Sequence, residues 1–179
     1  MISMKKDAVG LFVGRFQPLH NGHLEAMKWA LGKCSRLIIL VGSSQKCYEP
    51  ENPFTVGERI EMVHRALSAE KLAERCLILS IPDIGNNALW VAHVDSLVPR
   101  YDIVFSNNAL TVKLFREKGK EVMGIPFFKR ESHDGTKVRK AMLVGKKEWE
   151  KLVPKEVADF AREINALGRI KEVANGDKV

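Results

Sequence analysis

Short apolar runs alternate with stretches of helical periodicity along almost the whole chain. The runs are rich in β-branched residues, which favours strands, and apolar residues three and four apart favour helices between them. The predicted strands are residues 9–13, 37–41, 77–81, 103–105 and 121–125. The predicted helices are residues 22–31, 56–68, 87–98, 109–117, 136–143 and 155–164. This alternation predicts an α/β fold: a Rossmann-like, doubly wound parallel sheet of about five strands with helices on both faces.

Length and composition favour one globular unit. We expect a single domain over residues 1–179, with its core at about residues 9–164 and a mobile C-terminal end. With 45% hydrophobic and 28% charged residues, the composition excludes an intrinsically disordered chain. No apolar run approaches the roughly 20 residues of a membrane-spanning helix, so we expect a cytoplasmic protein without a membrane partner. The three cysteines are odd in number and far apart, which predicts neither a disulfide framework nor a metal site.

The net charge of +7 favours an anionic partner. The lysines and arginines are dispersed rather than clustered, so most of this charge is expected on a solvated surface. The charge is compatible with nucleotides, and we do not predict a nucleic-acid partner.

The loop after the first predicted strand carries the strongest chemical signal. Residues 14–23 follow a strand and open a helix, where free backbone N–H groups and the helix dipole favour an anion. His20 and His23 are three residues apart and share one face, and Gly22 between them leaves room for a phosphate. Together with Arg15 they can hold a triphosphate as charge builds on phosphorus. A surface histidine, a capping histidine and a turn glycine would each be ordinary alone, but the whole string favours phosphate binding.

A second helix start lies late in the chain. Asp134 precedes a short apolar periodic stretch, Thr136 offers a hydroxyl and a backbone N–H, and Arg139 lies one turn later on the same face. Taken alone, a plain Asp N-cap with a solvated arginine explains this segment at least as well.

The loop after the third predicted strand combines an acid, an amide and a large aromatic. Asp83 and Asn87 can bond a carboxamide, and Trp90 offers a face for a flat, cationic pyridinium. Alternatively, Asn87 caps a helix and Trp90 anchors the core, and composition alone favours this second explanation.

The segment His20 to His23 has the H-x-G-H signature of the nucleotidylyltransferase superfamily, and residues 14–20 resemble the archaeal type of nicotinamide-nucleotide adenylyltransferase. Thr136 and Arg139 match the family's second signature, I-S-x-T-x-x-R. The resemblance extends over about residues 9–164. It implies that His20, His23, Arg15 and Arg139 are catalytic. It also implies an ATP site made of Gly14, Arg15, Phe16, Gln17, His20, Gly22, His23, Thr136 and Arg139.

The acceptor loop resembles the family element P-D-I-x-x-N-x-L-W, which forms the nicotinamide pocket. The resemblance thus implies that Asp83, Ile84, Asn87 and Trp90 bind nicotinamide mononucleotide (NMN) or NAD, with Asn107 as a further candidate.

The chain departs from the family pattern at two places. Glu51 stands where archaeal relatives usually carry a basic residue, and we infer that Lys46 from the same loop supplies the missing charge to ATP. His133 and Asp134 replace an apolar residue and a serine, so Asp134 is repulsive to a polyphosphate unless it caps the helix.

The resemblance implies transfer of AMP from ATP to NMN, giving NAD and pyrophosphate by direct in-line attack. A Mg²⁺ ion held by substrate and water is expected, since no clustered carboxylates form a protein metal cage. Relatives assemble into hexamers, which implies a homo-oligomer. The alternatives are a sister adenylyltransferase acting on phosphopantetheine or FMN, and a non-catalytic nucleotide-binding or RNA-binding module.

Overall fold

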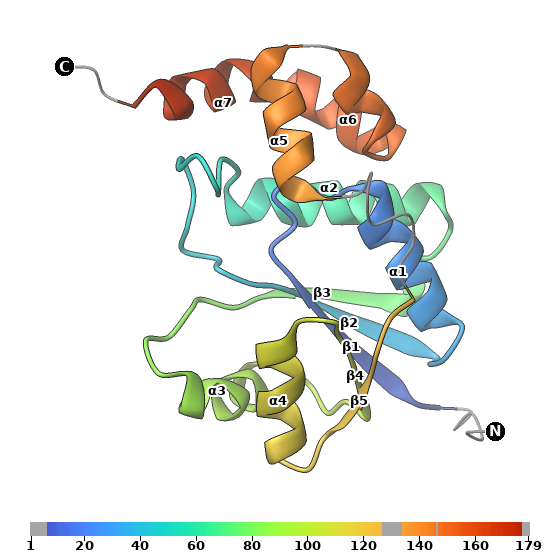
Figure 1. Cartoon of the computed structure of the whole chain (residues 1–179). Helices are drawn as coiled ribbons and strands as arrows, with labels where there is room; N and C mark the ends of the chain where they lie inside the picture. Colours follow the sequence, from blue (N-terminus) through green and yellow to red (C-terminus); the bar gives the residue numbers. More distant parts are fainter. Residues whose placement is uncertain (1–6, 127–133, 146, 177–179) are drawn as a thin grey trace.

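A five-stranded parallel sheet forms the centre of the computed structural model, which describes residues 7–126, 134–145 and 147–176 (Figure 1). The strands are β1 (Val9–Gly14), β2 (Arg36–Val41), β3 (Cys76–Ser80), β4 (Ile103–Phe105) and β5 (Glu121–Met123). Their order is β3-β2-β1-β4-β5, and every neighbouring pair is parallel. The chain therefore winds outward from β1 to β3 and then crosses back to β4, so the order reverses between β1 and β4.

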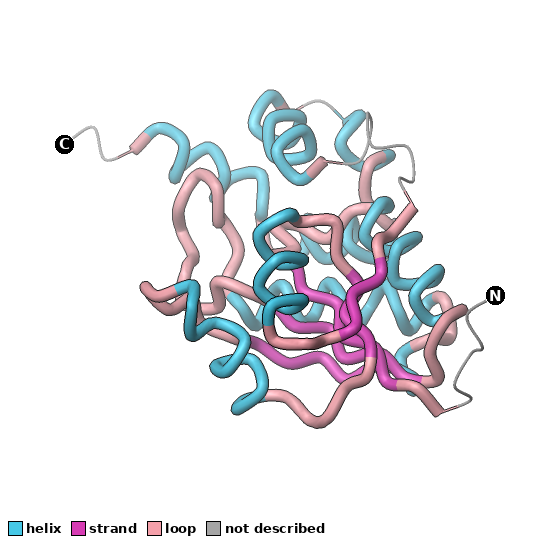
Figure 2. Tube along the Cα trace, turned by 60° about the horizontal axis from the view of Figure 1, so that its bottom comes forward, coloured by secondary structure: helices cyan, strands magenta, loops and turns pink. Residues whose placement is uncertain are grey.

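Helices cover both faces of the sheet, as predicted (Figure 2). One face packs against α1 (Asn21–Leu31) and α2 (Val56–Ala69). The helices α5 (Gly135–Val144), α6 (Lys155–Glu163) and α7 (Ala166–Asn175) belong to the same apolar cluster and lie beyond α2 as a further layer (Figure 1). The other face packs against α3 (Trp90–Leu97) and α4 (Ala109–Glu117). Short 3₁₀ helices lie at η1 (Ala73–Arg75), η2 (Asn87–Leu89) and η3 (Lys147–Lys151). The prediction of a doubly wound α/β fold is confirmed.

Alternation along the strands produces the two cores. In β2, Leu37 and Ile39 face the larger apolar cluster while Ile38 and Leu40 face the smaller one, because successive strand residues point to opposite faces. All four side chains are buried, which is typical of a parallel strand covered on both sides.

The expected core boundary at residue 164 lies too early. Helix α7 follows, and its Ala166 and Ile170 are buried in the larger cluster. The expected helix 87–98 is also divided, since residues 87–89 form the 3₁₀ turn η2 before α3 begins. Within the described ranges, no helix is both long and apolar enough to cross a membrane.

Candidate functional site

A cavity of about 650 Å³ lies where the strand order reverses. This is the expected position for a ligand in an open parallel sheet, and the volume lies in the usual range for small-molecule sites. Its walls come from segments that follow β1, β4 and β5 and from the starts of α1 and α5. The lining residues are Arg15, Phe16, Gln17, His20, Gly22, His23, Ala26, Asn107, Asn108, Ile125, Pro126, Asp134, Gly135, Thr136 and Arg139.

Two histidines cap the start of α1 reciprocally. The Nδ1 of His20 accepts the backbone N–H of His23 at 3.3 Å, and the Nδ1 of His23 accepts that of His20 at 3.3 Å. The rings stack with their centroids 3.6 Å apart, and Phe16 packs edge-on against His23 at 5.0 Å. Because Nδ1 is an acceptor in both rings, a neutral imidazole at either position carries its proton on Nε2. Each ring can therefore donate an Nε2–H bond to an anion.

The charge of His23 is unfavourable in this arrangement. Burial, and then the adjacent His20, lower the pKa of His23 well below its usual value of 6.5. In the ligand-free protein, His23 is thus a neutral hydrogen-bond donor near neutral pH. A bound phosphate would stabilise its protonated form.

The start of α5 faces the same cavity. Asp134 is the N-cap, and its carboxylate accepts the backbone N–H of Thr136 at 2.9 Å. Arg139 donates from Nη1 to the carbonyl of Gln17 at 2.8 Å and from Nη2 to the Thr136 hydroxyl at 3.4 Å. Burial, and then the nearby charge of Arg15, lower the pKa of Arg139, although a guanidinium stays charged at neutral pH. Two cations and two helix starts therefore converge on one cavity.

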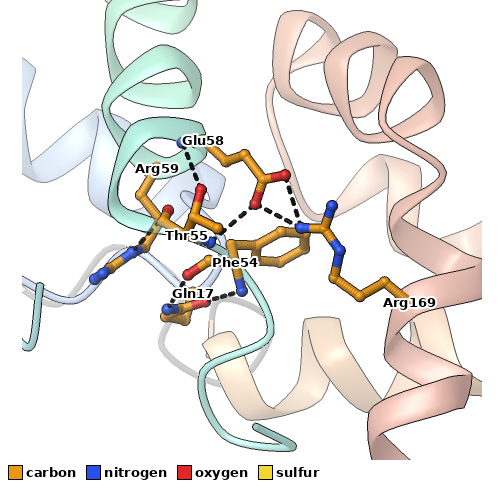
Figure 3. Close-up of polar contacts among 6 residues, drawn as sticks. All are labelled: Gln17, Phe54, Thr55, Glu58, Arg59 and Arg169. Atoms are coloured by element: carbon orange, nitrogen blue, oxygen red, sulfur yellow. Dashed lines mark hydrogen bonds and ion pairs between the residues drawn. The ribbon is translucent and has the colours of Figure 1, made fainter. Parts of the chain in front are cut away.

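Gln17 is bonded to the segment before α2 through its side chain (Figure 3) and to α5 through its backbone carbonyl. Its amide donates to the carbonyl of Phe54 and accepts the N–H of Phe54, each at 2.9 Å. Its own carbonyl accepts from Arg139. Gln17 is buried, and its amide holds the loop after β1 against the segment that precedes α2.

Two residues of the expected ATP set lie outside the cavity lining. Gly14 ends β1 beneath the Phe16 ring, where an added Cβ would come within 2.7 Å of that ring. Lys46 reaches Asp83 instead, with 3.7 Å between Nζ and Oδ2. The structure thus gives Gly14 a packing role and pairs Lys46 with the acceptor loop.

The acceptor candidates are separated from the phosphate candidates. Asn107 lines the cavity and exchanges two hydrogen bonds with the backbone of Ile125, at 2.6 and 2.9 Å. Asp83, Ile84, Asn87 and Trp90 follow the edge strand β3 and do not line the cavity.

Asp83 is positioned by the loop after β2. It accepts a hydrogen bond from the Ser43 hydroxyl at 3.0 Å, and its backbone N–H donates to the Gln45 side chain at 3.0 Å. Trp90 is half-buried and packs edge-on against Phe115 at 5.4 Å. Asn87 is exposed at the first position of η2.

Comparison with known proteins identifies the family. Residues 11–141 match the family model described as Cytidylyltransferase-like. The nicotinamide-nucleotide adenylyltransferase of Thermococcus onnurineus is 47% identical over 165 residues, which cover 92% of this chain and 88% of that protein. The enzyme of the same name from Archaeoglobus fulgidus is 44% identical over 170 residues, which cover 93% and 97%. The chain belongs to the nicotinamide-nucleotide adenylyltransferase family.

A solved structure confirms the fold of this chain. The solved protein is a bifunctional NMN adenylyltransferase/ADP ribose pyrophosphatase from Francisella tularensis, complexed with AMP and a Mn ion. It matches with a TM-score of 0.74 at 20% identity, over 94% of this chain and 52% of that chain. This adenylyltransferase-family chain thus spans about half the length of the bifunctional protein.

Two residues of this family member shape the site although sequence reasoning gave them no role. Arg59 is fully buried, and its guanidinium group donates to the backbone carbonyls of Arg15, Gly42, Ser43, Ser44 and Thr55, of which Figure 3 draws Thr55. It therefore joins the loops after β1 and β2 to the start of α2. Asn21 donates its backbone N–H to Leu152 at 3.0 Å and its amide to Lys151 at 2.9 Å, which ties α1 to η3. The only sequence signal for Arg59 was a cation among apolar residues of a helix face.

Proposed function

We propose that this chain is a nicotinamide-nucleotide adenylyltransferase, which joins AMP from ATP to NMN and releases pyrophosphate. The observation that carries the proposal is the convergence of the His20–His23 pair with Thr136 and Arg139 on one cavity. Relatives of this name share 40–47% identity over more than nine-tenths of the chain, which supports the same activity.

The chemistry is an in-line displacement at the α-phosphorus of ATP. An oxygen of the NMN 5′-phosphate forms a bond to that phosphorus while the bond to the bridging oxygen of pyrophosphate breaks. Pyrophosphate leaves with the electron pair, and no covalent enzyme intermediate is needed. The proposed catalytic residues are His20, His23, Arg15 and Arg139, which stabilise the charge that spreads over the phosphate oxygens.

The proposed ATP site includes the backbone around Phe16 and Gln17, Gly22 and the Thr136 hydroxyl. Each of these residues lines the cavity. Gln17 supports the ATP site through its two hydrogen bonds to Phe54, because its side-chain amide is already bonded there. We retain no direct ATP contact for Gly14 or Lys46, which lie outside the lining.

The proposed NMN site is formed by Asp83, Ile84, Asn87 and Trp90, with Asn107 at the cavity. Lys46 balances the charge of Asp83, and Ser43 orients its carboxylate. In this proposal the acceptor binds beside the cavity, near the loops that follow β2 and β3, with its phosphate toward the histidine pair.

A Mg²⁺ ion fits this site as a partner of ATP. In the described part of the chain no group of three or more His, Cys, Asp or Glu side chains is arranged to hold a metal, and the Asp134 carboxylate is engaged as a helix cap. We therefore propose that the ion is held by phosphate oxygens and water, where it neutralises charge as pyrophosphate leaves. A cytoplasmic location, a hexameric homo-oligomer and the lack of a nucleic-acid partner are proposed on the family resemblance and the dispersed charge.

The proposal is tested by pyrophosphate release from ATP and Mg²⁺ with a panel of acceptors. NMN should support turnover and yield NAD, detected by its enzymatic reduction to NADH. Turnover only with phosphopantetheine or FMN would instead establish a sister transferase. Folded protein that releases no pyrophosphate with any acceptor would support a non-catalytic binding module.

A further inference from the structure

The last described helix, α7, is fixed to the start of α2 by an ion pair. The Arg169 Nη1 on α7 lies 2.7 and 2.5 Å from the two carboxylate oxygens of Glu58 on α2 (Figure 3). Both side chains are 16% exposed, which makes this the most buried ion pair between described residues. The guanidinium also lies over the Tyr48 ring, 5.0 Å from its centroid. Limited exposure and two neighbouring partners hold Arg169 in one geometry, unlike an ordinary surface pair.

Glu58 connects this ion pair to the backbone that precedes α2. Its Oε2 accepts the N–H of Thr55 at 2.9 Å, while the Thr55 hydroxyl accepts the N–H of Glu58 at 3.2 Å. This is a capping box, and Phe54 is the residue immediately before it. The position of the Phe54 peptide group thus depends on the Glu58 carboxylate.

Phe54 connects the capping box to the phosphate-binding loop. Its peptide groups exchange two hydrogen bonds with the buried Gln17 amide, and the Gln17 carbonyl in turn accepts from Arg139. A continuous chain of contacts therefore runs from Arg169 through Glu58, Phe54 and Gln17 to Arg139.

Helix α7 also touches the second phosphate element directly. It packs against α5, the helix that carries Thr136 and Arg139, and lies beside it in Figure 1. Its Ala166 and Ile170 are buried in the main core. The same helix therefore supports both walls of the cavity, α5 by packing and the loop after β1 through Glu58.

We infer that Arg169 is a positioning residue for ATP, which acts through Glu58 and Gln17 to fix the spacing between the two phosphate-binding elements. This inference rests on the proposed function, because it concerns how the same site is organised. Arg169 does not line the cavity, so its removal affects ATP through geometry and not through a lost contact.

The test compares Arg169→Met with Arg65→Met. Arg65 is a matched control, because it also pairs α2 with a C-terminal helix, through Glu163 on α6, and also lies over an aromatic ring, that of Phe160. Arg65, Glu163 and Phe160 do not line the cavity. Arg169→Met should raise the KM for ATP about tenfold, with the KM for NMN changed by less than about twofold. Arg65→Met should leave both KM values near those of the unmodified protein.

Two further variants separate positioning from folding. Glu58→Gln keeps an acceptor for the Thr55 N–H but loses the ion pair, so it should raise the KM for ATP as Arg169→Met does. The double variant should be no worse than either single one, because the two residues act as a unit. Arg169→Lys, which keeps a charge within reach of Glu58, should restore part of the ATP affinity.

Calorimetric binding of ATP with Mg²⁺ to the same proteins distinguishes this inference from the proposed function. Unmodified protein that binds ATP but makes no NAD would overturn the function, and the ATP Kd of each variant would still decide the role of Arg169. An unchanged ATP Kd in Arg169→Met, or an equal loss in Arg65→Met, would overturn the inference. Failure of the unmodified chain to bind ATP would overturn both.

Discussion

At the scale of single residues, the stacked imidazoles of His20 and His23 connect the start of α1 to the proposed AMP transfer. Their Nδ1 atoms cap α1, so a neutral ring at either position carries its proton on Nε2. His23→Ala should lower turnover by about 10²–10³-fold, because a donor to the developing phosphate charge is lost. Loss of its capping bond should cost only about 1 kcal/mol of stability.

Pyrophosphate release and thermal unfolding measure these two effects separately. His64→Ala is the control, since His64 is an exposed histidine on α2. Turnover of His23→Ala within a few-fold of the unmodified protein would exclude a catalytic role for His23.

The lowered pKa of His23 also predicts how stability depends on pH. In the unfolded chain the pKa of His23 is about 6.5, whereas in the folded protein the pKa of His23 is lower. The stabilisation is therefore complete above the unfolded pKa and is lost as pH falls through the folded value. In that window, the free energy of unfolding should fall by up to about 1.4 kcal/mol per pH unit more in the unmodified protein than in His23→Ala. Urea unfolding of both proteins between about pH 5 and about pH 7 measures this difference, and parallel curves would contradict it.

Substitution of Trp90 should affect the binding of NMN and of ATP differently. The ring packs against Phe115 but remains half-buried, which leaves part of it accessible to a pyridinium. Trp90→Ala should raise the KM for NMN by about tenfold or more, with a much smaller effect on the KM for ATP. Steady-state kinetics with each substrate varied in turn measures this ratio. Equal changes in both KM values would assign Trp90 to the core alone.

Residue types predicted which side chains line the cavity better than which residues support it. Arg15, His20, His23, Thr136 and Arg139 all line one cavity, as expected from the two motifs. Gly14 and Lys46 do not, because a glycine that accommodates an aromatic ring looks the same in sequence as one that approaches a phosphate. Arg59 had no visible role, since its five acceptors are backbone carbonyls that are brought together only by folding.

At the scale of elements, the start of α5 combines a capping carboxylate with the proposed polyphosphate site. Asp134→Asn keeps an equally good N-cap but removes a negative charge from the cavity lining. ATP affinity should therefore rise by about two- to fivefold, with little change in Tm. Calorimetry with ATP and Mg²⁺ measures the affinity. Glu121→Gln is the control for net charge, because Glu121 begins β5 and is remote from the cavity lining. Weaker ATP binding by Asp134→Asn would show that the carboxylate contributes to the site.

Element boundaries were predictable to within a few residues where caps or periodicity marked them. The Thr55 to Glu58 capping box marks the start of α2 in both sequence and structure. Helix α7 was missed, although Ala166, Leu167 and Ile170 are spaced for one helix face. Asn165 separates it from α6 with a φ of +50°, a local turn that periodicity does not reveal. The contact between α7 and α2 depends on this turn and was therefore beyond sequence reasoning.

At the scale of the whole molecule, the phosphate site unites segments that are far apart in the chain. The hydrogen bond between Arg139 and Gln17 spans 122 residues. The loops after β1 and β4 meet where the strand order reverses, and α5, which follows β5, lines the cavity at the same place. The alternation of strands and helices predicted a parallel sheet, in which ligands bind beyond the carboxyl ends of the strands, but not which loops meet there. The position of the acceptor loop on the edge strand β3 was not predictable, since alternation does not fix strand order.

A ligand that bridges these segments should stabilise the entire fold. At a concentration about 100 times its Kd, ATP should add about 2.7 kcal/mol to the free energy of unfolding, a rise in Tm of roughly 5–10 °C for a chain of this size. Arg15→Met should lose most of this increase while its unliganded Tm stays near that of the unmodified protein. The reason is that Arg15 is exposed and lines the cavity, and one charge-assisted hydrogen bond contributes about 1.5–3 kcal/mol. Thermal unfolding with and without ATP and Mg²⁺ measures both quantities. If ATP raised the Tm of Arg15→Met as much as that of the unmodified protein, the phosphates would not lie between Arg15 and α5.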